Sequence, residues 1–304
     1  MKGSLKYPMM IAGMVISWSV YYAVSKVVVD ATGSPLLAGF FLRCAALLFL
    51  TAQVFFDGTI KRILTPGKAL PFLLLIGLFG FLLDLFANLG YAHGSLSTGT
   101  ALLKTDVLMV NLITVILYRQ KLFLTDWVGT AVMLFGVLLV LGVDFTGMTF
   151  HVTDLFFLLS AASVTANAFI IKSVQSAHGA DSDTISYYNN AVVLVLFFCS
   201  CLFTAGLPFT ASSFSIAPRL LLPLILLGGL AQTGIYFFYY RNLRHFEVWI
   251  VKLYLLLMPV LSLLIGVFFL HETLTPQKTA GIAIVLAGAA LIVLRSKIHK
   301  EAEV

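Results

Sequence analysis

The sequence predicts an all-α membrane protein in which ten transmembrane helices form two inverted five-helix repeats. Hydrophobic residues make up 60% of the 304 and charged residues only 11%, whereas a soluble domain carries about 25% charged residues. Apolar residues gather in stretches of about 20, the length at which a helix crosses the hydrocarbon core of a bilayer. The connections between the stretches are short, which excludes an ATPase, a kinase or a receptor with a soluble domain.

The first five expected spans occupy residues 1–146. The first span follows Lys2 and Lys6 and has no convincing cleavage site, so we interpret it as a helix and not as a removed signal peptide. The second, third and fourth contain charged residues within apolar runs, and the fifth contains Gly129 and Gly136. The expected limits are Pro8–Val28, Leu36–Phe56, Leu70–Leu89, Ser97–Tyr118 and Trp127–Val143.

The second five expected spans occupy residues 147–304, which end in a short cytoplasmic tail. The sixth and seventh spans carry asparagines, and the eighth ends in the aromatic run at 236–240. The ninth contains Lys252, and the tenth contains Gly281 and Gly288. The expected limits are Leu155–Val174, Thr184–Leu207, Leu220–Tyr239, Val248–Leu270 and Thr279–Leu294.

The distribution of basic residues predicts that both termini lie in the cytoplasm. With this orientation, thirteen of the nineteen Lys and Arg residues fall in cytoplasmic segments, three fall outside and three lie within spans. Such an excess of basic residues on one side is typical of cytoplasmic loops. We therefore expect an integral protein of the bacterial inner membrane, with the lipid bilayer as its surroundings. The net charge of +6 belongs to these loops and predicts no nucleic-acid partner.

The two halves of the chain resemble each other. At a shift of 152 residues, the polar connection 119–122 aligns with 271–274, and the glycine pairs of the fifth and tenth spans align. Near the front of each half the shift falls to 146, where Lys26 meets Lys172. Five spans per half force the second half to insert upside down relative to the first. Inverted repeats of this kind are an architecture of secondary transporters.

With these features the chain resembles members of the drug/metabolite transporter superfamily and, within it, the EamA-type family of ten-helix carriers. The second half carries the pattern well, with Met258-Pro259, an apolar run, then His271-Glu272-Thr-Leu274 and the glycines of the last helix. The first half departs from it, because Val107 stands where the family usually has proline and Gln120 where it usually has glutamate. The resemblance implies alternating access and a central cavity lined by helices 1, 3, 4, 6, 8 and 9. It does not fix the substrate.

Charged residues within the spans are the first candidates for a substrate path, because charges at that depth are costly and are usually kept for function or for pairing. Asp84, Lys104 and Arg43 are expected at similar depth, so Asp84 could pair with either cation or meet the substrate. Lys104 and Asp106 are two residues apart and should point about 200° apart on a helix, so only one should face the path. We favour Lys104. Asp84 and Asp106 are candidates for taking up a proton.

Other candidates lie on the helices expected to line the cavity. Lys252 either reaches the path or extends its stem to the interface. Aromatic faces can hold an organic cation or stack on a flat ring, and several aromatic residues are too deep for an interfacial belt. Asparagines in spans usually bond between helices, although two could reach substrate. The complete set of predicted substrate-binding residues is Lys104, Asp84, Trp18, Tyr22, Asn88, Asn167, Tyr236, Lys252 and Tyr254.

The favoured function is a secondary transporter that moves a small polar metabolite, such as an amino acid or a similar zwitterion, by alternating access. The alternatives are a carrier of organic cations that uses an aromatic cage, and a channel. A membrane-embedded enzyme is not expected, since the sequence shows no nucleophile or metal-binding constellation. We expect no cofactor and no metal. A proton is a candidate coupling ion, and a monomer and a homodimer both remain open.

Overall fold

A computed structural model describes residues 6–93, 102–140, 154–205, 218–258, 260–261 and 275–302, and every regular element in these ranges is a helix. The all-α prediction is confirmed. The long helices are α1 (Lys6–Thr32), α2 (Pro35–Phe56), α4 (Leu70–His93), α8 (Asp154–Ala177), α9 (Ser182–Ala205), α10 (Pro218–His245) and α13 (Pro276–Ala302). The shorter elements are α3 (Ile60–Leu64), η1 (Gly67–Ala69), α6 (Asp106–Ile116), α7 (Leu124–Val140), α11 (Val248–Tyr254) and η3 (Leu255–Leu257).

Each of the ten expected spans contains a helix in the described part of the chain. Six described helices are long and apolar enough to cross a membrane, namely α1, α2, α4, α8, α9 and α10. The described apolar parts of α6, α7, α11–η3 and α13 are shorter, and parts of the fourth, fifth and ninth spans lie outside the described residues. The last helix continues to Ala302, past the expected end at Leu294. The motif 271–274 also lies outside the described residues.

The fourth span differs most from the expectation of one continuous helix. Leu102 and Leu103 are helical, Lys104 and Thr105 form a turn, and α6 begins only at Asp106. The hydroxyl of Thr105 donates a hydrogen bond to the carbonyl oxygen of Leu102 (2.6 Å), and the Thr105 side chain does not cap α6. Two of the buried charged residues therefore stand at an irregular point in the bundle.

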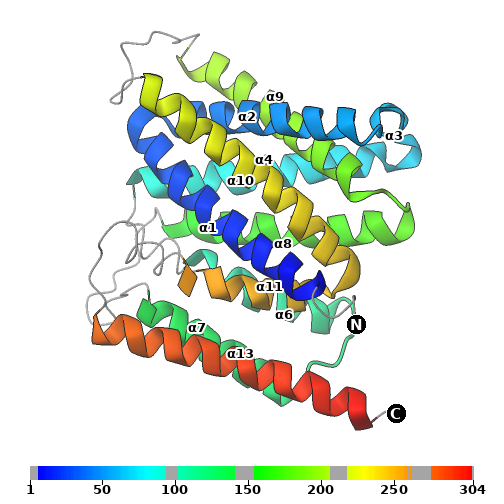
Figure 1. Cartoon of the computed structure of the whole chain (residues 1–304), viewed down its shortest axis with the longest axis vertical. Coiled ribbons are helices and arrows are strands. Elements are labelled where there is room, and N and C mark those ends of the chain that lie inside the picture. Colours follow the sequence, from blue (N-terminus) through cyan, green and yellow to red (C-terminus); the bar gives the residue numbers. More distant parts are fainter. Residues whose placement is uncertain are drawn as a thin grey trace.

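The helices pack in pairs that cross between the two halves of the chain (Figure 1). Helix α1 packs on α10 and α4 packs on α8, while α2 packs on α9, α6 on α11 and α7 on α13. If each helix is exchanged with the helix five spans away along the chain, α1 becomes α8 and α10 becomes α4, so the α1–α10 contact becomes the α8–α4 contact. The pairs α2–α9, α6–α11 and α7–α13 are unchanged by the same exchange. This exchange is the pattern that two related five-helix units would produce. In Figure 1, α7 and α13 form one edge of the molecule, beside α6 and α11.

Glycines bring α7 and α13 into close contact. A Cβ at Gly136 would lie 2.9 Å from the carbonyl oxygen of Gly281, and a Cβ at Gly288 would lie 3.1 Å from that of Gly129. These two contacts exchange with each other under the 152-residue shift. The prediction that the aligned glycines are close-packing positions is confirmed, and such small residues are typical of helix contacts in membranes.

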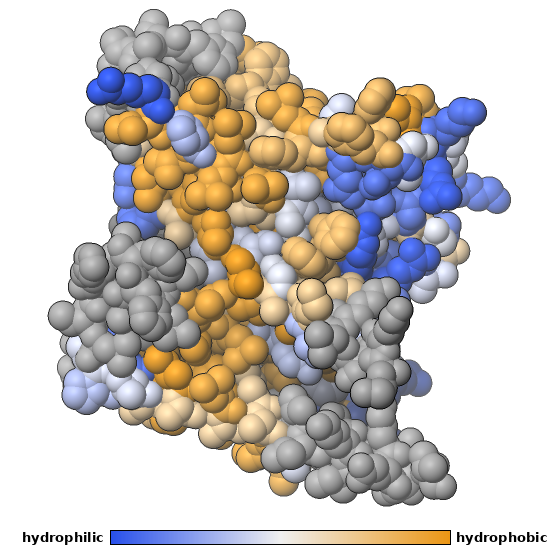
Figure 2. Space-filling model, in the orientation of Figure 1, coloured by the Kyte–Doolittle hydropathy of each residue, from blue (hydrophilic) through white to orange (hydrophobic). Residues whose placement is uncertain are grey.

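The first residues of α1 and the last residues of α13 lie at the same end of the bundle, as an even number of crossings requires (Figure 1). The short helix α3 and the connections at 117–123 and 178–181 lie at this end too. Lys61, Arg62 and Lys68 are exposed there. Figure 2 shows hydrophilic residues over the upper part of this end, next to a broad apolar surface over the helices.

Candidate functional site

Two small neighbouring cavities lie inside the bundle. The first has a volume of about 40 Å³ and the second about 20 Å³. Trp18, Leu83 and Val164 line both cavities, so the two cavities are adjacent. Because a cavity needs about 10–15 Å³ to hold one water molecule, this conformation accommodates a few waters and no amino acid. Binding a metabolite therefore requires helices to move apart.

The first cavity is built around a buried ion pair between α2 and α4. The guanidinium of Arg43 donates to Asp84 through Nε (2.9 Å to Oδ2) and through Nη2. It also donates to the hydroxyl of Tyr236 on α10, and Asn190 on α9 donates to the carbonyl oxygen of Arg43 (3.0 Å). Four helices thus converge on Arg43. Asp84 pairs with Arg43, one of the two partners expected for it.

The second cavity contains the other buried ion pair. Lys252 on α11 donates to Asp106 at the start of α6, with 2.8 Å between Nζ and Oδ2. The Lys252 side chain is 1% exposed, so it does not extend to the membrane interface. Its Nζ lies 5.7 Å from the ring centroid of Tyr239. This pair joins a helix of the first half of the chain to a helix of the second half.

Lys104 lines the second cavity beside that pair without forming an ion pair of its own. The four ion pairs among the described residues do not include it. Its Nζ lies 4.0 Å from the sulfur of Met258, and the residue is 7% exposed. The lining of the second cavity therefore carries two lysines and one aspartate. A buried cation with so weak a partner is costly unless an anion joins it.

The expectation that Lys104 and Asp106 face opposite sides is wrong. Both side chains line the second cavity. The 200° separation assumed a continuous α-helix, but Lys104 and Thr105 form a turn before α6 begins. The break in the helix brings both charges to one cavity.

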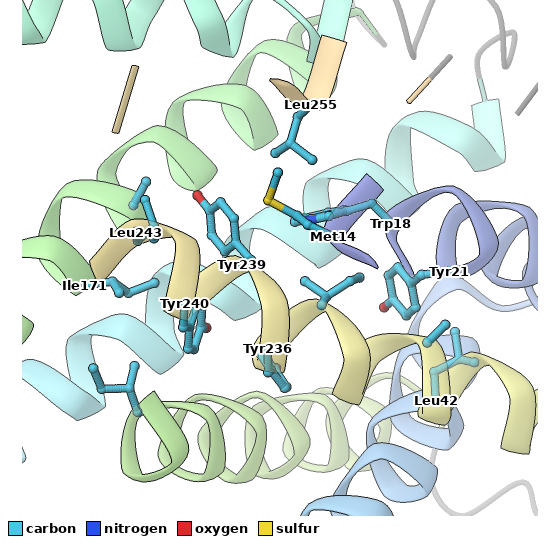
Figure 3. Close-up of a cluster of buried hydrophobic side chains, with 14 of the residues drawn as sticks. Met14, Trp18, Tyr21, Leu42, Ile171, Tyr236, Tyr239, Tyr240, Leu243 and Leu255 are labelled. Carbon is cyan, nitrogen blue, oxygen red and sulfur yellow. The ribbon is translucent and has the colours of Figure 1, made fainter. Parts of the chain in front are cut away.

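Aromatic side chains from α1 and α10 surround the first cavity. Tyr236, Tyr239 and Tyr240 share one face of α10 because they are three and four residues apart, and Trp18 and Tyr21 approach from α1 (Figure 3). Trp18 meets Tyr239 edge-on at 6.1 Å between ring centroids. Tyr240 accepts a hydrogen bond from Asn189. This aromatic wall reaches both ion pairs, because Tyr236 lies beside Arg43 and Tyr239 lies beside Lys252.

Five buried polar atoms in the lining lack a hydrogen-bond partner within the described ranges. They are Trp18 Nε1, Asp106 Oδ1, Asn167 Oδ1, Asn189 Oδ1 and the hydroxyl of Tyr239. Buried polar groups are rarely left unpaired, and each of these belongs to a side chain that lines a cavity. Together they offer an indole donor, three acceptor oxygens and a hydroxyl that can donate or accept. No three His, Cys, Asp or Glu side chains in the described part of the chain are placed to hold a metal ion.

The structure brings most of the predicted site residues together. Seven of the nine line one of the two cavities: Trp18, Tyr22, Asp84, Lys104, Asn167, Tyr236 and Lys252. The other two line neither. Asn88 instead donates to the carbonyl oxygen of Pro35 (3.2 Å), and Tyr254 packs against the hydrophobic core.

Sequence reasoning did not select Tyr21, Tyr239, Tyr240 or Gln232, all of which line the first cavity. The spacing of the tyrosines on α10 was an available signal, since positions three and four apart share a face. All six helices expected to line the cavity do so, and α2 and α9 contribute as well through Arg43 and Asn189.

Comparison with known proteins defines the class. The EamA-like transporter family matches residues 5–142 and again residues 151–294. The chain therefore belongs to the EamA-like transporter family, within the drug/metabolite transporter superfamily, and is an integral membrane protein.

Individual relatives are more distant. The chain is 24% identical to a protein of Salmonella typhimurium strain LT2 named a probable amino-acid metabolite efflux pump, with 96% of each chain covered. It is 26% identical to an uncharacterized transporter of Archaeoglobus fulgidus, over 83% of this chain and 88% of that one. A crystal structure described simply as that of a protein matches with a TM-score of 0.74 at 16% identity, covering 96% of this chain and 98% of the other. That likeness concerns the fold alone.

Proposed function

We propose that the protein is a secondary carrier that moves a small zwitterion, with an amino acid as the first candidate, across the bacterial inner membrane. The observation that carries this proposal is the second cavity, where Lys104, Asp106 and Lys252 place both signs of charge in one lining. A zwitterion can satisfy both signs at once. The name of the Salmonella relative, a probable amino-acid metabolite efflux pump, supports the same substrate class.

The proposed mechanism is alternating access between two inverted units, residues 1–146 and 147–304, with both termini in the cytoplasm. The two family matches divide the chain close to this boundary, and the exchange of helix contacts supports the same division. In such carriers the site lies between the repeats and one unit rocks against the other. The Asp106–Lys252 pair spans the two units, so it would have to adjust in every transport cycle.

A proton is the proposed coupling ion, and Asp106 is a better candidate than Asp84 for carrying it. Both Nε and Nη2 of Arg43 bind Oδ2 of Asp84. The Oδ2 of Asp106 accepts a hydrogen bond from Lys252, while its Oδ1 has no hydrogen-bond partner in the described ranges. A proton on that free oxygen would weaken the attraction to Lys252 and release the contact between the two units.

The test begins with a ligand screen on purified protein. A ligand at one hundred times its Kd stabilises the folded state by about 2.7 kcal/mol, so a thermal shift identifies candidates among metabolites. The best candidate is then measured in proteoliposomes. Saturable counterflow is expected for a carrier, whereas steady conductance without counterflow would show a channel and overturn the proposal.

A carrier of organic cations is the second candidate, favoured by the aromatic wall. Cation–π contacts contribute about 0.5–2 kcal/mol per ring. Replacing Trp18, Tyr22 or Tyr236 by Leu would therefore weaken the binding of tetraethylammonium by about tenfold if a cage exists. For a zwitterion held by charges, the changes at Tyr22 and Tyr236 should cost less than Lys104→Ala. Unchanged binding in every Leu variant would remove the cage.

A further inference from the structure

We propose that Lys104 and the indole N–H of Trp18 form a subsite for the carboxylate of the substrate, so that the carrier selects molecules by this group. The inference rests on the transport function proposed above. It deepens that function by assigning one functional group of the substrate to two named side chains. Both side chains line the second cavity, and both are more than nine-tenths buried.

Lys104 supplies the charge. Lys252 already forms an ion pair with the carboxylate of Asp106, with 2.8 Å between Nζ and Oδ2. Arg43 forms an ion pair with Asp84. In the described lining, Lys104 is the cation left over, with only the sulfur of Met258 at 4.0 Å. The first cavity is balanced and the second carries one excess positive charge. A ligand carboxylate is the group that removes this excess.

Trp18 supplies a donor with no other acceptor. Its Nε1 is buried and has no hydrogen-bond partner within the ranges that the structure describes. An indole nitrogen can only donate, so its complement is an acceptor such as a carboxylate oxygen. Trp18 lies on α1 and Lys104 in the turn before α6. A carboxylate held by both would join two helices of the first unit.

Trp18 lines both cavities. A substrate whose carboxylate lies beside Lys104 and Trp18 could therefore extend its body past Trp18 toward the first cavity. Tyr21, Tyr239 and Tyr240 surround that space (Figure 3). An organic cation without a carboxylate would meet the excess positive charge and leave the Trp18 donor unpaired, so the site disfavours it.

The first experiment compares matched probes that differ only at this group. Thermal shift is measured on the purified full chain with the twenty L-amino acids and with their twenty α-carboxamides. We expect at least one amino acid to bind, and its carboxamide to need at least tenfold more ligand for the same shift, since hydrogen bonds to charged groups are stronger than neutral ones. A carboxamide that binds as well as its amino acid overturns the inference.

Variants then assign the effect to the two side chains. Trp18→Phe keeps an aromatic ring and removes the donor, and Lys104→Gln removes the charge. Each should weaken amino-acid binding about tenfold or more and lower the ratio of amino-acid to carboxamide binding. Lys104→Arg should retain most of the preference. Trp249→Phe is the control, because Trp249 lies on α11 and lines neither cavity.

Each outcome separates this inference from the transport function. If Trp18→Phe and Lys104→Gln leave the ratio of acid to amide binding unchanged while counterflow persists, the subsite is wrong and the carrier stands. If Trp18→Phe unfolds, the ratio of acid to amide binding is compared between Lys104→Arg and Lys104→Gln. Equal ratios in these two variants also overturn the subsite. If no probe in either series binds or is transported, the zwitterion carrier fails together with its subsite.

Discussion

Asp84 holds a buried guanidinium at the meeting point of four helices. Arg43 is 3% exposed, and Asp84→Asn would leave its charge without a counterion. Breaking a buried ion pair on one side costs about 3–5 kcal/mol. We expect Asp84→Asn to lower the melting temperature of the purified protein strongly, and the double change Arg43→Gln with Asp84→Asn to restore much of it. Equal stability of the single variant and the unchanged protein would show that the pair contributes nothing to folding.

Lys104 differs from Arg43 because its removal leaves no unpaired carboxylate behind. Asp106 keeps Lys252 as its partner, and the Nζ of Lys104 lies beside the sulfur of Met258. We expect Lys104→Ala to fold and insert, with at least tenfold lower counterflow of the ligand identified by thermal shift. Lys26→Ala is the matched control, since Lys26 forms an exposed pair with Asp30 and such pairs contribute about 0.3–0.5 kcal/mol. Normal counterflow in Lys104→Ala would exclude Lys104 from the path.

At the scale of elements, the packing of α7 against α13 depends on positions without a side chain. A Cβ at Gly136 would lie 2.8 Å from the backbone nitrogen of Val285 and 2.9 Å from the carbonyl oxygen of Gly281. Backbone atoms cannot turn away as a side chain does, so Gly136→Ala should destabilise the protein by about 1–3 kcal/mol. Thermal unfolding in detergent measures this effect. Ala131→Val, on the exposed face of the same helix, should have little effect, and equal losses in both variants would refute the packing argument.

The end of α10 depends on a lysine from another helix. Lys172 on α8 donates to the carbonyl oxygens of Leu243 and Phe246, each at 2.9 Å. A cation near the last carbonyls of a helix satisfies groups that have no partner within the helix. We expect Lys172→Met to speed hydrogen exchange of the backbone amides at 244–249 while the amides at the centre of α10 remain protected. Unchanged exchange there would show that water replaces Lys172 without cost.

At the scale of the whole molecule, hydrophobic stretches and basic loops were sufficient to predict an all-helical membrane protein, and the family match confirms the class. Apolar runs of bilayer length have few other folding solutions. The aligned glycines also predicted close packing, because small residues at helical spacing have a steric purpose. Most candidate site residues were found for a similar reason, since charged and aromatic side chains deep in a span are costly unless they face other groups.

What could not be predicted depends on breaks in regular structure and on side-chain partners. The turn at Lys104 and Thr105 contains no glycine or proline that would predict it. The angle of a continuous helix was therefore assumed between Lys104 and Asp106, and the prediction that they face opposite sides was wrong. The pairing of Asp106 with Lys252 joins residues 146 positions apart, and no local pattern indicates such a partner. Asn88 and Tyr254 lie on the expected helices but line neither cavity, because depth alone does not fix which face of a helix turns inward.

The insertion of the two units in opposite directions is the most general prediction about the molecule. Asp30 and Ser176 are equivalent under the 146-residue shift, and both are exposed at the ends of their helices, α1 and α8. Inverted units place them on opposite sides of the membrane. In a background where Cys44, Cys199 and Cys201 are replaced, Asp30→Cys should react with a membrane-impermeant maleimide added outside intact cells. Ser176→Cys should react only after the cells are opened. Labelling of both from the outside would mean that the units insert in the same direction, and alternating access through exchange of their conformations would then have to be abandoned.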